Sequence, residues 1–416
     1  MTQQVTHVLV GYSPVMLAKL DTFLPPRSVL VLEEPGVIEA RGAAAAVAGL
    51  RCVAELRPAP TQDEEHPERV IEAVERPAGV RVVVPAAEYG VVIAAALAEA
   101  WGLPGASPKA AKVLRDKAVL RATVAGSEIG QPAFATVTSA EEVEAFRAAY
   151  GRQVVVKPAN RQASLGVQLL DEQDDSAAAW AHAVEADEPA LRATYEGAAR
   201  FLVEQRLYGP EVSVEAIVHE GLVGFVNVTA KSVQDSKYPV ETGHALPADL
   251  PSEVNDALRQ AIQQLATVVG FCNGILHAEW ILADGRPHLV ECAGRLPGDG
   301  ITVLLDLAYD SDVLANLIQV LSGEGAVPEL PVVQGASVRF VTAPPGVVRS
   351  VDAEEAKVAE GVFEVHLNLA AGSTVKAATS SWERAGFVIA AGPTTAEAVR
   401  RAEHAAGLVE IKVGAE

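Results

Sequence analysis

The chain of 416 residues contains few cysteines, and they stand far apart at Cys52, Cys272 and Cys292. None of them belongs to a C-x-x-C spacing, so neither a disulfide framework nor a zinc site is expected. This usage fits a reducing compartment, and we expect a cytoplasmic protein. The first residues, MTQQVTHVLVGYS, lack a basic segment followed by a long apolar one. No apolar run reaches the roughly 18 residues that cross a bilayer, so we expect no membrane partner.

Basic residues are also scarce, because 33 lysines and arginines stand against 54 acidic residues and give a formal charge of -21. A chain this acidic is a poor partner for nucleic acids, whose phosphates attract basic surfaces. If it binds a smaller polyanion, its few basic residues must gather locally. The sequence also lacks a G-x-G-x-x-G after its first apolar run and a G-x-x-x-x-G-K-[ST] motif anywhere. A dinucleotide fingerprint and a Walker A loop are therefore excluded.

The length suggests two to four domains, at roughly 150 residues each. Apolar runs at 8–12, 29–33 and 80–86 alternate with Ala-rich helical stretches at 37–49, 67–75 and 90–101. Continuous Val/Leu runs between helices are typical of buried parallel strands, so we predict a Rossmann-like α/β domain over residues 1–106. Tyr89 follows the third run, at the edge where open α/β sheets bind ligands. It is a candidate substrate contact, and the alternative is a domain that serves only as a scaffold.

A predicted hairpin near residue 284 carries two carboxylates. Glu279 and Glu291 lie on apolar runs that flank the turn dipeptide Asp284-Gly285. Folding this hairpin brings the two glutamates together, and Arg295 follows four residues after the second one. Neighbouring carboxylates repel unless a cation lies between them, and oxygen ligands of this kind suit magnesium bound with substrate phosphates. A hairpin with surface glutamates is the structural alternative.

Basic residues gather where a phosphate partner would need them. Ser107 is a good N-cap for a helix predicted over residues 108–125, which carries several lysines and arginines. A strand then ends at Lys157, before a loop with the small residues Ala163, Ser164 and Gly166. An ammonium beside such a loop can surround phosphate oxygens, together with backbone N–H groups. The alternative is a hairpin with a lysine at its mouth.

The next segments contain further candidates. After a helical stretch predicted over 174–199, Glu204 ends one apolar run and Glu211 opens an antiparallel hairpin. Such a linker can meet an adenine edge and ribose hydroxyls, although glutamates at strand ends are common. Residues 232–251 form a polar connection, long for a compact domain, in which His244 is a candidate substrate contact or proton carrier. A lone loop histidine usually has neither role.

From about residue 323 the composition becomes rich in Pro, Gly and Val. We predict strands near 336–343, 362–369 and 387–391 and a helix near 395–406. This part contains no catalytic constellation, so we predict a closing or structural α+β domain.

Taken in order, these motifs resemble one superfamily. Lys117, the run VVVKPA with Lys157, the loop to Gly166, VEQRLYGPEVSVE and the pair HAEW and VECAGR resemble the ATP-grasp superfamily over residues 1–323. The stretch PVETGHALPADLP and the residues after 323 resemble its branch of L-amino-acid ligases, or dipeptide synthetases, and related carboxylate-amine ligases. The resemblance implies a multidomain α/β and α+β fold: a pre-ATP-grasp domain (1–106), an ATP-grasp domain (107–323) with a small nucleotide-clamping subdomain (about 126–205), and a C-terminal α+β lid domain (324–416).

The resemblance also implies a role for each candidate residue. It assigns ATP binding to Lys117, Lys157, Ser164, Gly166, Glu204, Gln205, Leu207 and Glu211. It assigns Mg²⁺, with Mn²⁺ as an alternative, to Glu279 and Glu291. It makes Arg295 the group that meets the acyl phosphate, with Lys117 and Lys157 as further catalytic residues. Substrate contacts would come from His244, Gly298 and Asp299, beside the candidate Tyr89.

One departure from the family concerns the metal. Many ATP-grasp enzymes have Asn two residues after the second glutamate, where this chain has Ala293. The implied reaction joins an amino acid or small carboxylic acid to an amine, in a homodimeric enzyme of peptide natural-product biosynthesis. Alternatives are loading of an amino acid onto a carrier-protein thiol, a carboxylase similar to biotin carboxylase, or a nucleotide-binding regulatory module without turnover.

Overall fold

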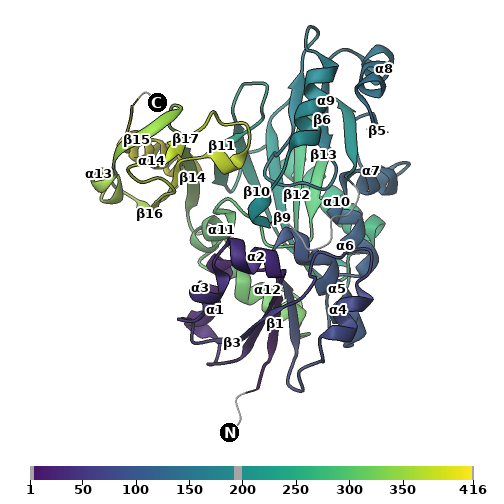
Figure 1. Cartoon of the computed structure of the whole chain (residues 1–416), viewed down its shortest axis with the longest axis vertical. Coiled ribbons are helices and arrows are strands. Elements are labelled where there is room, and N and C mark those ends of the chain that lie inside the picture. Colours follow the sequence, from purple (N-terminus) through teal and green to yellow (C-terminus); the bar gives the residue numbers. More distant parts are fainter. Residues whose placement is uncertain (1–3, 192–198, 415–416) are drawn as a thin grey trace.

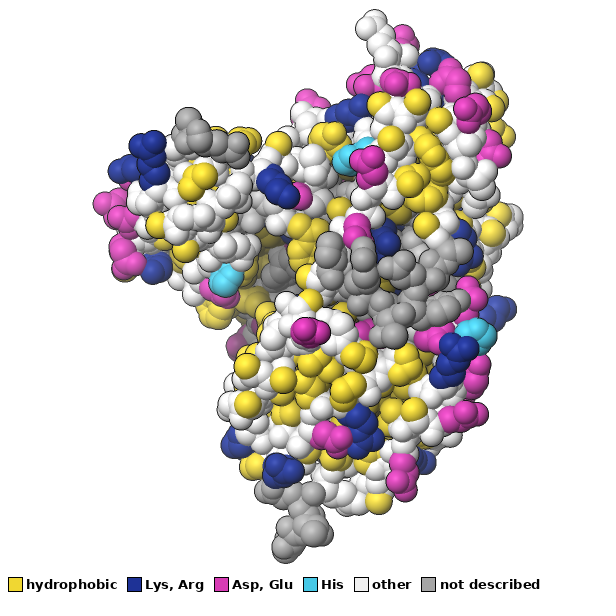
Figure 2. Space-filling view, in the orientation of Figure 1, with side chains coloured by type: hydrophobic (Ala, Val, Ile, Leu, Met, Phe, Trp, Pro, Cys, Tyr) yellow, Lys and Arg dark blue, Asp and Glu magenta, His cyan; other side chains and the backbone are white. Residues whose placement is uncertain are grey.

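The computed structural model describes residues 4–191 and 199–414. Three lobes surround a central sheet: the N-terminal domain lies at the bottom of Figure 1, a small antiparallel subdomain at the upper right, and the C-terminal residues at the upper left. Figure 2 shows the two upper lobes as separate masses with a notch between them. Every helix in the described part of the chain is too short or too polar to cross a membrane.

The N-terminal domain is a parallel sheet in the order β3-β2-β1-β4, with β1 (His7–Val10), β2 (Val29–Glu33), β3 (Val53–Pro58) and β4 (Val82–Pro85). Alternate side chains of β1 face opposite cores: Leu9 packs with α1 (Pro14–Phe23) and α3 (Ala43–Val47), whereas Val8 packs with α4 (Glu68–Ala73) and α5 (Val91–Ala100). The helix α2 (Pro35–Ala40) follows β2. The predicted α/β architecture is confirmed, but the sequence missed β3, an edge strand with a polar sequence.

The helix predicted over 108–125 is wrong as a single element. It is two helices, α6 (Pro108–Arg115) and α7 (Lys117–Val124). Asp116 is extended between them, with φ -129° and ψ 111°, and its carboxylate accepts from the backbone N–H groups of Ala118 and Val119. A side-chain N-cap of this kind restarts the chain in a new direction. Lys117 therefore begins α7, and its backbone N–H donates to the Ala159 carbonyl.

The small subdomain is an antiparallel sheet in the order β5-β8-β6-β7. Its strands are β5 (Phe134–Val137), β6 (Val154–Pro158), β7 (Gln168–Leu170) and β8 (Phe201–Gln205). The helices α8 (Ala140–Tyr150) and α9 (Ser176–Glu185) share its core. The helix predicted over 174–199 is thus too long: α9 ends at Glu185, a 3₁₀ turn (Pro189–Leu191) follows, and residues 192–198 lie outside the described part.

The largest sheet is antiparallel, in the order β13-β12-β9-β10-β11-β14-β18-β16. Its first five strands in chain order are β9 (Glu211–His219), β10 (Leu222–Val233), β11 (Glu241–Leu246), β12 (Gly274–Ala283) and β13 (Arg286–Ala293). The helix α10 (Ser252–Val269) packs on one face. The helices α11 (Ile301–Tyr309) and α12 (Val313–Leu321) pack between the other face and the N-terminal sheet. The prediction of one long connection over 232–251 is wrong in part, because β11 lies within this segment.

The C-terminal residues extend this sheet with β14 (Gly335–Val341), β16 (Val362–Leu367) and β18 (Gly386–Gly392). A second small sheet joins β15 (Gly346–Asp352), β17 (Thr374–Val375) and β19 (Glu410–Gly414), beside α13 (Glu354–Lys357) and α14 (Thr395–Gly407). The predicted strands and helix of this part are confirmed within a few residues. Because β11 pairs with β14, one sheet runs across the proposed boundary at 323, and the domain division stays a prediction.

Candidate functional site

A cavity of about 640 Å³ lies where the N-terminal sheet, the small subdomain and the largest sheet meet. Its volume is in the usual range for a ligand pocket. Every site residue predicted from the sequence lines it except Gly166. Gly166 has φ +73°, and a Cβ there would come within 2.7 Å of Ala186 and 2.9 Å of Pro158. Its role in the structure is to allow close packing of the loop against the subdomain.

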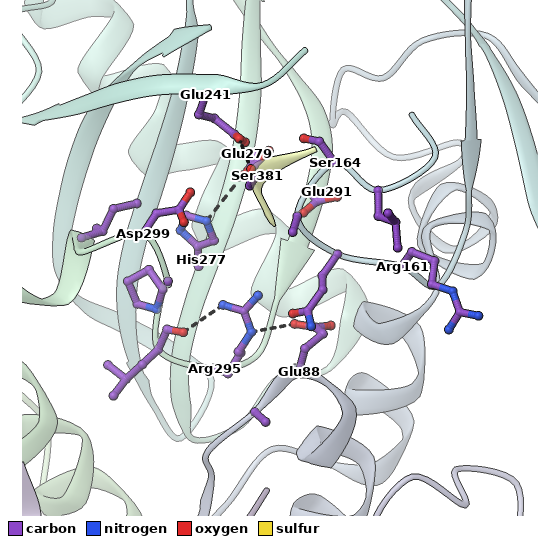
Figure 3. Close-up of a pocket in the computed structure, with 18 of the residues that line it drawn as sticks. Glu88, Arg161, Ser164, Glu241, His277, Glu279, Glu291, Arg295, Asp299 and Ser381 are labelled. Atoms are coloured by element: carbon purple, nitrogen blue, oxygen red, sulfur yellow. Dashed lines mark hydrogen bonds and ion pairs between the residues drawn. The ribbon is translucent and has the colours of Figure 1, made fainter. Parts of the chain in front are cut away.

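The paired glutamates are the centre of the cavity (Figure 3). Glu279 and Glu291 are direct cross-strand partners on β12 and β13. The turn residues Asp284 and Gly285 both have positive φ, 50° and 72°, as a two-residue hairpin of this type requires. The predicted hairpin is therefore confirmed, and it places two carboxylates side by side.

Each of these carboxylates has a lysine partner. Lys231 Nζ lies 2.7 Å from Glu279, and Lys117 Nζ lies 2.8 Å from Glu291. Burial alone would raise the pKa of Glu279, but Lys231 and His277 outweigh burial and hold that pKa well below its usual range. Each glutamate thus contacts one lysine, and its carboxylate oxygens are ligands of the kind that suit Mg²⁺. No cluster of three or more His, Cys, Asp or Glu side chains that could hold a metal occurs among the described residues.

The position where many relatives have Asn contributes no metal ligand. Ala293 is the cross-strand partner of His277, whose imidazole Nε2 lies 3.6 Å from Glu279 and whose Nδ1 lies 3.0 Å from Glu215. These carboxylates raise the pKa of His277 to about 9 despite its burial. Magnesium commonly binds through one or two protein carboxylates and completes its shell with phosphates and water, so the two glutamates fit it without a third side chain.

The loop after β6, which we predict to bind phosphate, has an unusual backbone. Ala163, Ser164 and Gly166 all have positive φ, at 57°, 55° and 73°. Lys157 at the end of β6 and Lys117 at the start of α7 both line the cavity nearby. Non-glycine residues with positive φ are uncommon and strained, and such strain concentrates at functional sites.

Glu204, which we predict to meet adenine together with the backbone after it, is held by two cations. Its carboxylate is buried and is shared between Arg121 Nε at 2.8 Å and Lys157 Nζ at 2.7 Å. Burial would raise the pKa of Glu204, but the two cations outweigh burial and lower it to about 2. This side chain therefore orients Lys157. Gln205 and Leu207 line the cavity beyond it, and their contact with a nucleotide stays a prediction.

Arg295 reaches the cavity from the segment after β13. Its Nε donates to Glu88 at 2.7 Å and its Nη1 to the Leu296 carbonyl at 2.9 Å (Figure 3). Arg115 approaches the same Glu88 carboxylate at 3.3 Å. Burial opposes ionisation of Glu88, but these arginines outweigh it and lower its pKa. The N-terminal domain therefore fixes the direction of the arginine, a contact that the sequence did not reveal.

Tyr89 lies at the predicted sheet edge, but its hydroxyl already has a partner. It donates to the buried carboxylate of Glu188, in the segment after α9, and the ring stacks beneath Arg115 at 4.8 Å. Burial and the Glu188 charge raise the pKa of Tyr89. In this structure Tyr89 thus ties the N-terminal domain to the small subdomain, and its role as a substrate contact stays a prediction.

His244 is not in a loop as predicted. It lies on β11, buried, with its Nε2 3.4 Å from Asp299. Asp299 has φ +56° and follows Gly298 in the turn before α11. Glu211, on β9, lines the cavity near Lys231, and burial raises its pKa. The structure therefore brings the expected substrate residues His244, Gly298 and Asp299 together at the cavity.

Several lining residues were missed: Glu88, Arg121, Lys231, Glu241, Ser381 and Arg384. Lys231 had a signal in the sequence, since it is the one charged residue of its strand. Arg121 belongs to the basic helical stretch predicted over 108–125. Glu88, Glu241, Ser381 and Arg384 had no such signal, because they reach the cavity only through the fold.

Comparison with known proteins agrees with this geometry. A model of the ATP-grasp domain matches residues 150–303, and a model described as L-amino acid ligase C-terminal domain 2 matches residues 339–414. The chain has an ATP-grasp fold. The crystal structure of an L-amino acid ligase from Bacillus licheniformis superposes on this ATP-grasp chain with a TM-score of 0.78, at 19% identity and over 100% of both chains. That likeness establishes the fold.

Curated relatives of the ATP-grasp chain match over only part of their length. An uncharacterized protein of Sinorhizobium fredii is 25% identical over 324 residues, which are 76% of this chain and 65% of the relative. Alanine–anticapsin ligase of Bacillus subtilis is 25% identical over 280 residues, 62% of this chain and 58% of the ligase. The chain spans about half to two thirds of the length of the curated relatives it matches.

Proposed function

We propose that this protein is an ATP-dependent carboxylate-amine ligase that joins an amino acid or small carboxylic acid to an amine, with a second amino acid as the preferred amine. The observation that carries the proposal is the convergence of the Glu279–Glu291 pair, Lys117, Lys157 and Arg295 on one cavity. The similarity to L-amino acid ligases supports the substrate class.

The proposed reaction has two steps. A carboxylate oxygen of the first substrate attacks the γ-phosphorus of ATP, the bond to the β-γ bridging oxygen breaks, and ADP leaves. The amine of the second substrate then attacks the acyl phosphate carbon, and inorganic phosphate leaves as the amide forms. The amine proton passes to phosphate or water.

Each group contributes by position and charge. Lys117 and Lys157 neutralise phosphate oxygens, and Ser164 with its neighbouring N–H groups closes over them. Glu279 and Glu291 would hold Mg²⁺, which when bound offsets the charge of the β and γ phosphates. Arg295, held by Glu88, stabilises the oxygen that becomes negative during amine attack.

Release of ADP and phosphate, measured over all pairs of the standard amino acids, tests this function. The proposal expects turnover that needs ATP and both amino acids, with a dipeptide as the product. Equal ADP release with bicarbonate and no amino acid would favour a carboxylase. Transfer to a carrier-protein thiol would appear as turnover with one amino acid and a thiol. A homodimer and a cytoplasmic location remain predictions, which light scattering and cell fractionation test.

A further inference from the structure

A short C-terminal segment, residues 380–384, reaches the wall of the cavity, and we name it the clasp segment. Its 3₁₀ turn is fixed by a capping box, in which the backbone N–H and hydroxyl of Ser380 both donate to Glu383, at 2.8 and 2.7 Å. The Ser381 backbone N–H donates to the carbonyl of Ala163 in the phosphate-binding loop, at 3.1 Å. The Ser381 hydroxyl donates to Glu241 on β11, at 2.8 Å. Figure 3 shows Ser381 beside Glu241 and Glu279.

Arg384 is the last residue of the clasp segment, and its guanidinium makes hydrogen bonds and a contact with an aromatic ring. Nη2 and Nη1 donate to the two carboxylate oxygens of Asp299 at 2.5 and 3.1 Å, and Nε donates to the Ser381 carbonyl at 2.9 Å. The guanidinium carbon lies 3.7 Å from the centroid of the Phe340 ring. The side chain is 10% exposed. A bidentate, stacked arginine of this kind has a single orientation, which a lysine cannot reproduce.

Arg384 contacts two residues that each contact His244 in turn. The carboxylate of Asp299, fixed by the guanidinium, accepts from His244 Nε2 across 3.4 Å. Phe340, beneath the guanidinium, meets the imidazole edge to face with ring centroids 5.5 Å apart. His244 Nδ1 is buried without a hydrogen-bond partner among the described residues, so its orientation depends on these two neighbours.

We propose that Arg384 is a positioning residue, by which the C-terminal domain holds Asp299 and His244 in place to receive the amino-acid substrate. The proposal rests on the proposed function. It assigns Arg384 to the amino-acid part of the cavity, because its contacts go to Asp299, Phe340 and the clasp segment and not to Lys117 or Lys157. The C-terminal domain then completes the site and is more than a cover.

The test compares R384M and R384K with R400M. Arg400 is the matched control, since it makes an exposed bidentate contact with Glu397 on α14 of the same domain. We expect R384M to raise the KM of the best amino acid by roughly tenfold or more and the KM of ATP by less than about twofold. R384K should recover only part of the loss, and R400M should behave as the wild type.

A crystal structure of R384M gives a readout that needs no substrate. We expect the Asp299 carboxylate to turn away from His244 in that structure. An unchanged amino-acid KM, or equal increases in both KM values, would overturn the proposal. If the wild type shows no amino-acid-dependent ADP release, the proposed function fails, and the crystal structure alone decides: Asp299 and His244 unmoved in R384M would then overturn the positioning role.

Discussion

Glu279 lies directly opposite Glu291 in the register of β12 and β13, and a different lysine contacts each of them. Two adjacent carboxylates repel each other, and nearby cations offset that repulsion. Lys231 and Lys117 supply that charge in the structure, and both line the cavity together with the glutamates. The two carboxylates therefore lie where they can bind a divalent cation together with substrate phosphates.

The metal assignment predicts a specific effect of Glu291→Gln. The amide keeps the size of the side chain but removes the negative charge that binds a divalent cation. We expect ADP formation to be lost while the melting temperature stays close to that of the wild type. The matched control is Glu253→Gln on α10, because Glu253 is exposed and lies outside the cavity. Unimpaired turnover of the Glu291 variant would contradict the assignment.

The buried group of Arg121, Lys157 and Glu204 predicts unequal costs for two substitutions. Glu204→Gln leaves two buried cations without their anion, which typically lowers the free energy of unfolding by about 3–5 kcal/mol. Lys157→Met keeps the Arg121–Glu204 pair, so its effect on stability should be smaller although nucleotide binding is lost. Urea unfolding measures both. Glu397→Gln, which removes the exposed carboxylate that Arg400 and Arg401 contact on α14, is the control and should lower the free energy of unfolding much less. Equal losses of unfolding free energy in Glu204→Gln and Lys157→Met would contradict the role of Glu204 as the shared partner of both cations.

Glu204 also predicts part of the acid sensitivity of the fold. Its pKa is about 2 in the folded protein against an ordinary 4.5. The carboxylate therefore stabilises the fold fully above pH 4.5, and that stabilisation disappears as the pH falls toward 2. At 1.36 kcal/mol per pKa unit, the advantage of the wild type over Glu204→Gln should shrink by about 2 kcal/mol between pH 6 and pH 3. Urea unfolding at both pH values checks this, and a constant difference would count against it.

Arg295 should act on the chemical step more than on binding. Removal of one preorganised donor to a developing oxyanion typically lowers kcat by about 10²–10³-fold. We expect Arg295→Met to show such a loss with MgATP affinity unchanged, as measured by calorimetry with an ATP analogue. Arg286→Met is the control, since Arg286 is exposed at the turn of the same hairpin. A variant that binds MgATP more weakly and keeps kcat would place Arg295 on the nucleotide instead.

The sequence predicted those parts of the site that depend on local patterns. The dipeptide Asp284-Gly285 predicted the hairpin and so the proximity of Glu279 and Glu291, although a register shift between Glu279 and Trp280 is what places the two glutamates directly opposite each other. The small residues around Ser164 predicted a loop beside Lys157, and the structure gives that loop its positive φ angles. Such features are determined by a few neighbouring residues, so they can be found without the fold.

The features of the site that the sequence did not predict depend on contacts between distant segments. Glu88 meets Arg295 across 207 positions of the chain, and Arg384 meets Asp299 across 85. No periodicity predicts such pairs. His244 was placed in a loop because its surroundings are polar and rich in proline, whereas pairing with β10 and β14 makes it part of a strand. The sequence does not reveal the break at Asp116, because the helical pattern of the residues on both sides continues across it.

The central claim is that the carboxylate substrate is activated as an acyl phosphate. It is tested most directly with an amino acid carrying ¹⁸O in both carboxylate oxygens, followed by mass spectrometry of the released phosphate. Our mechanism predicts that one ¹⁸O passes from the carboxylate to the phosphate in each turnover. Phosphate without the label, in a reaction that still forms the amide and ADP, would contradict it.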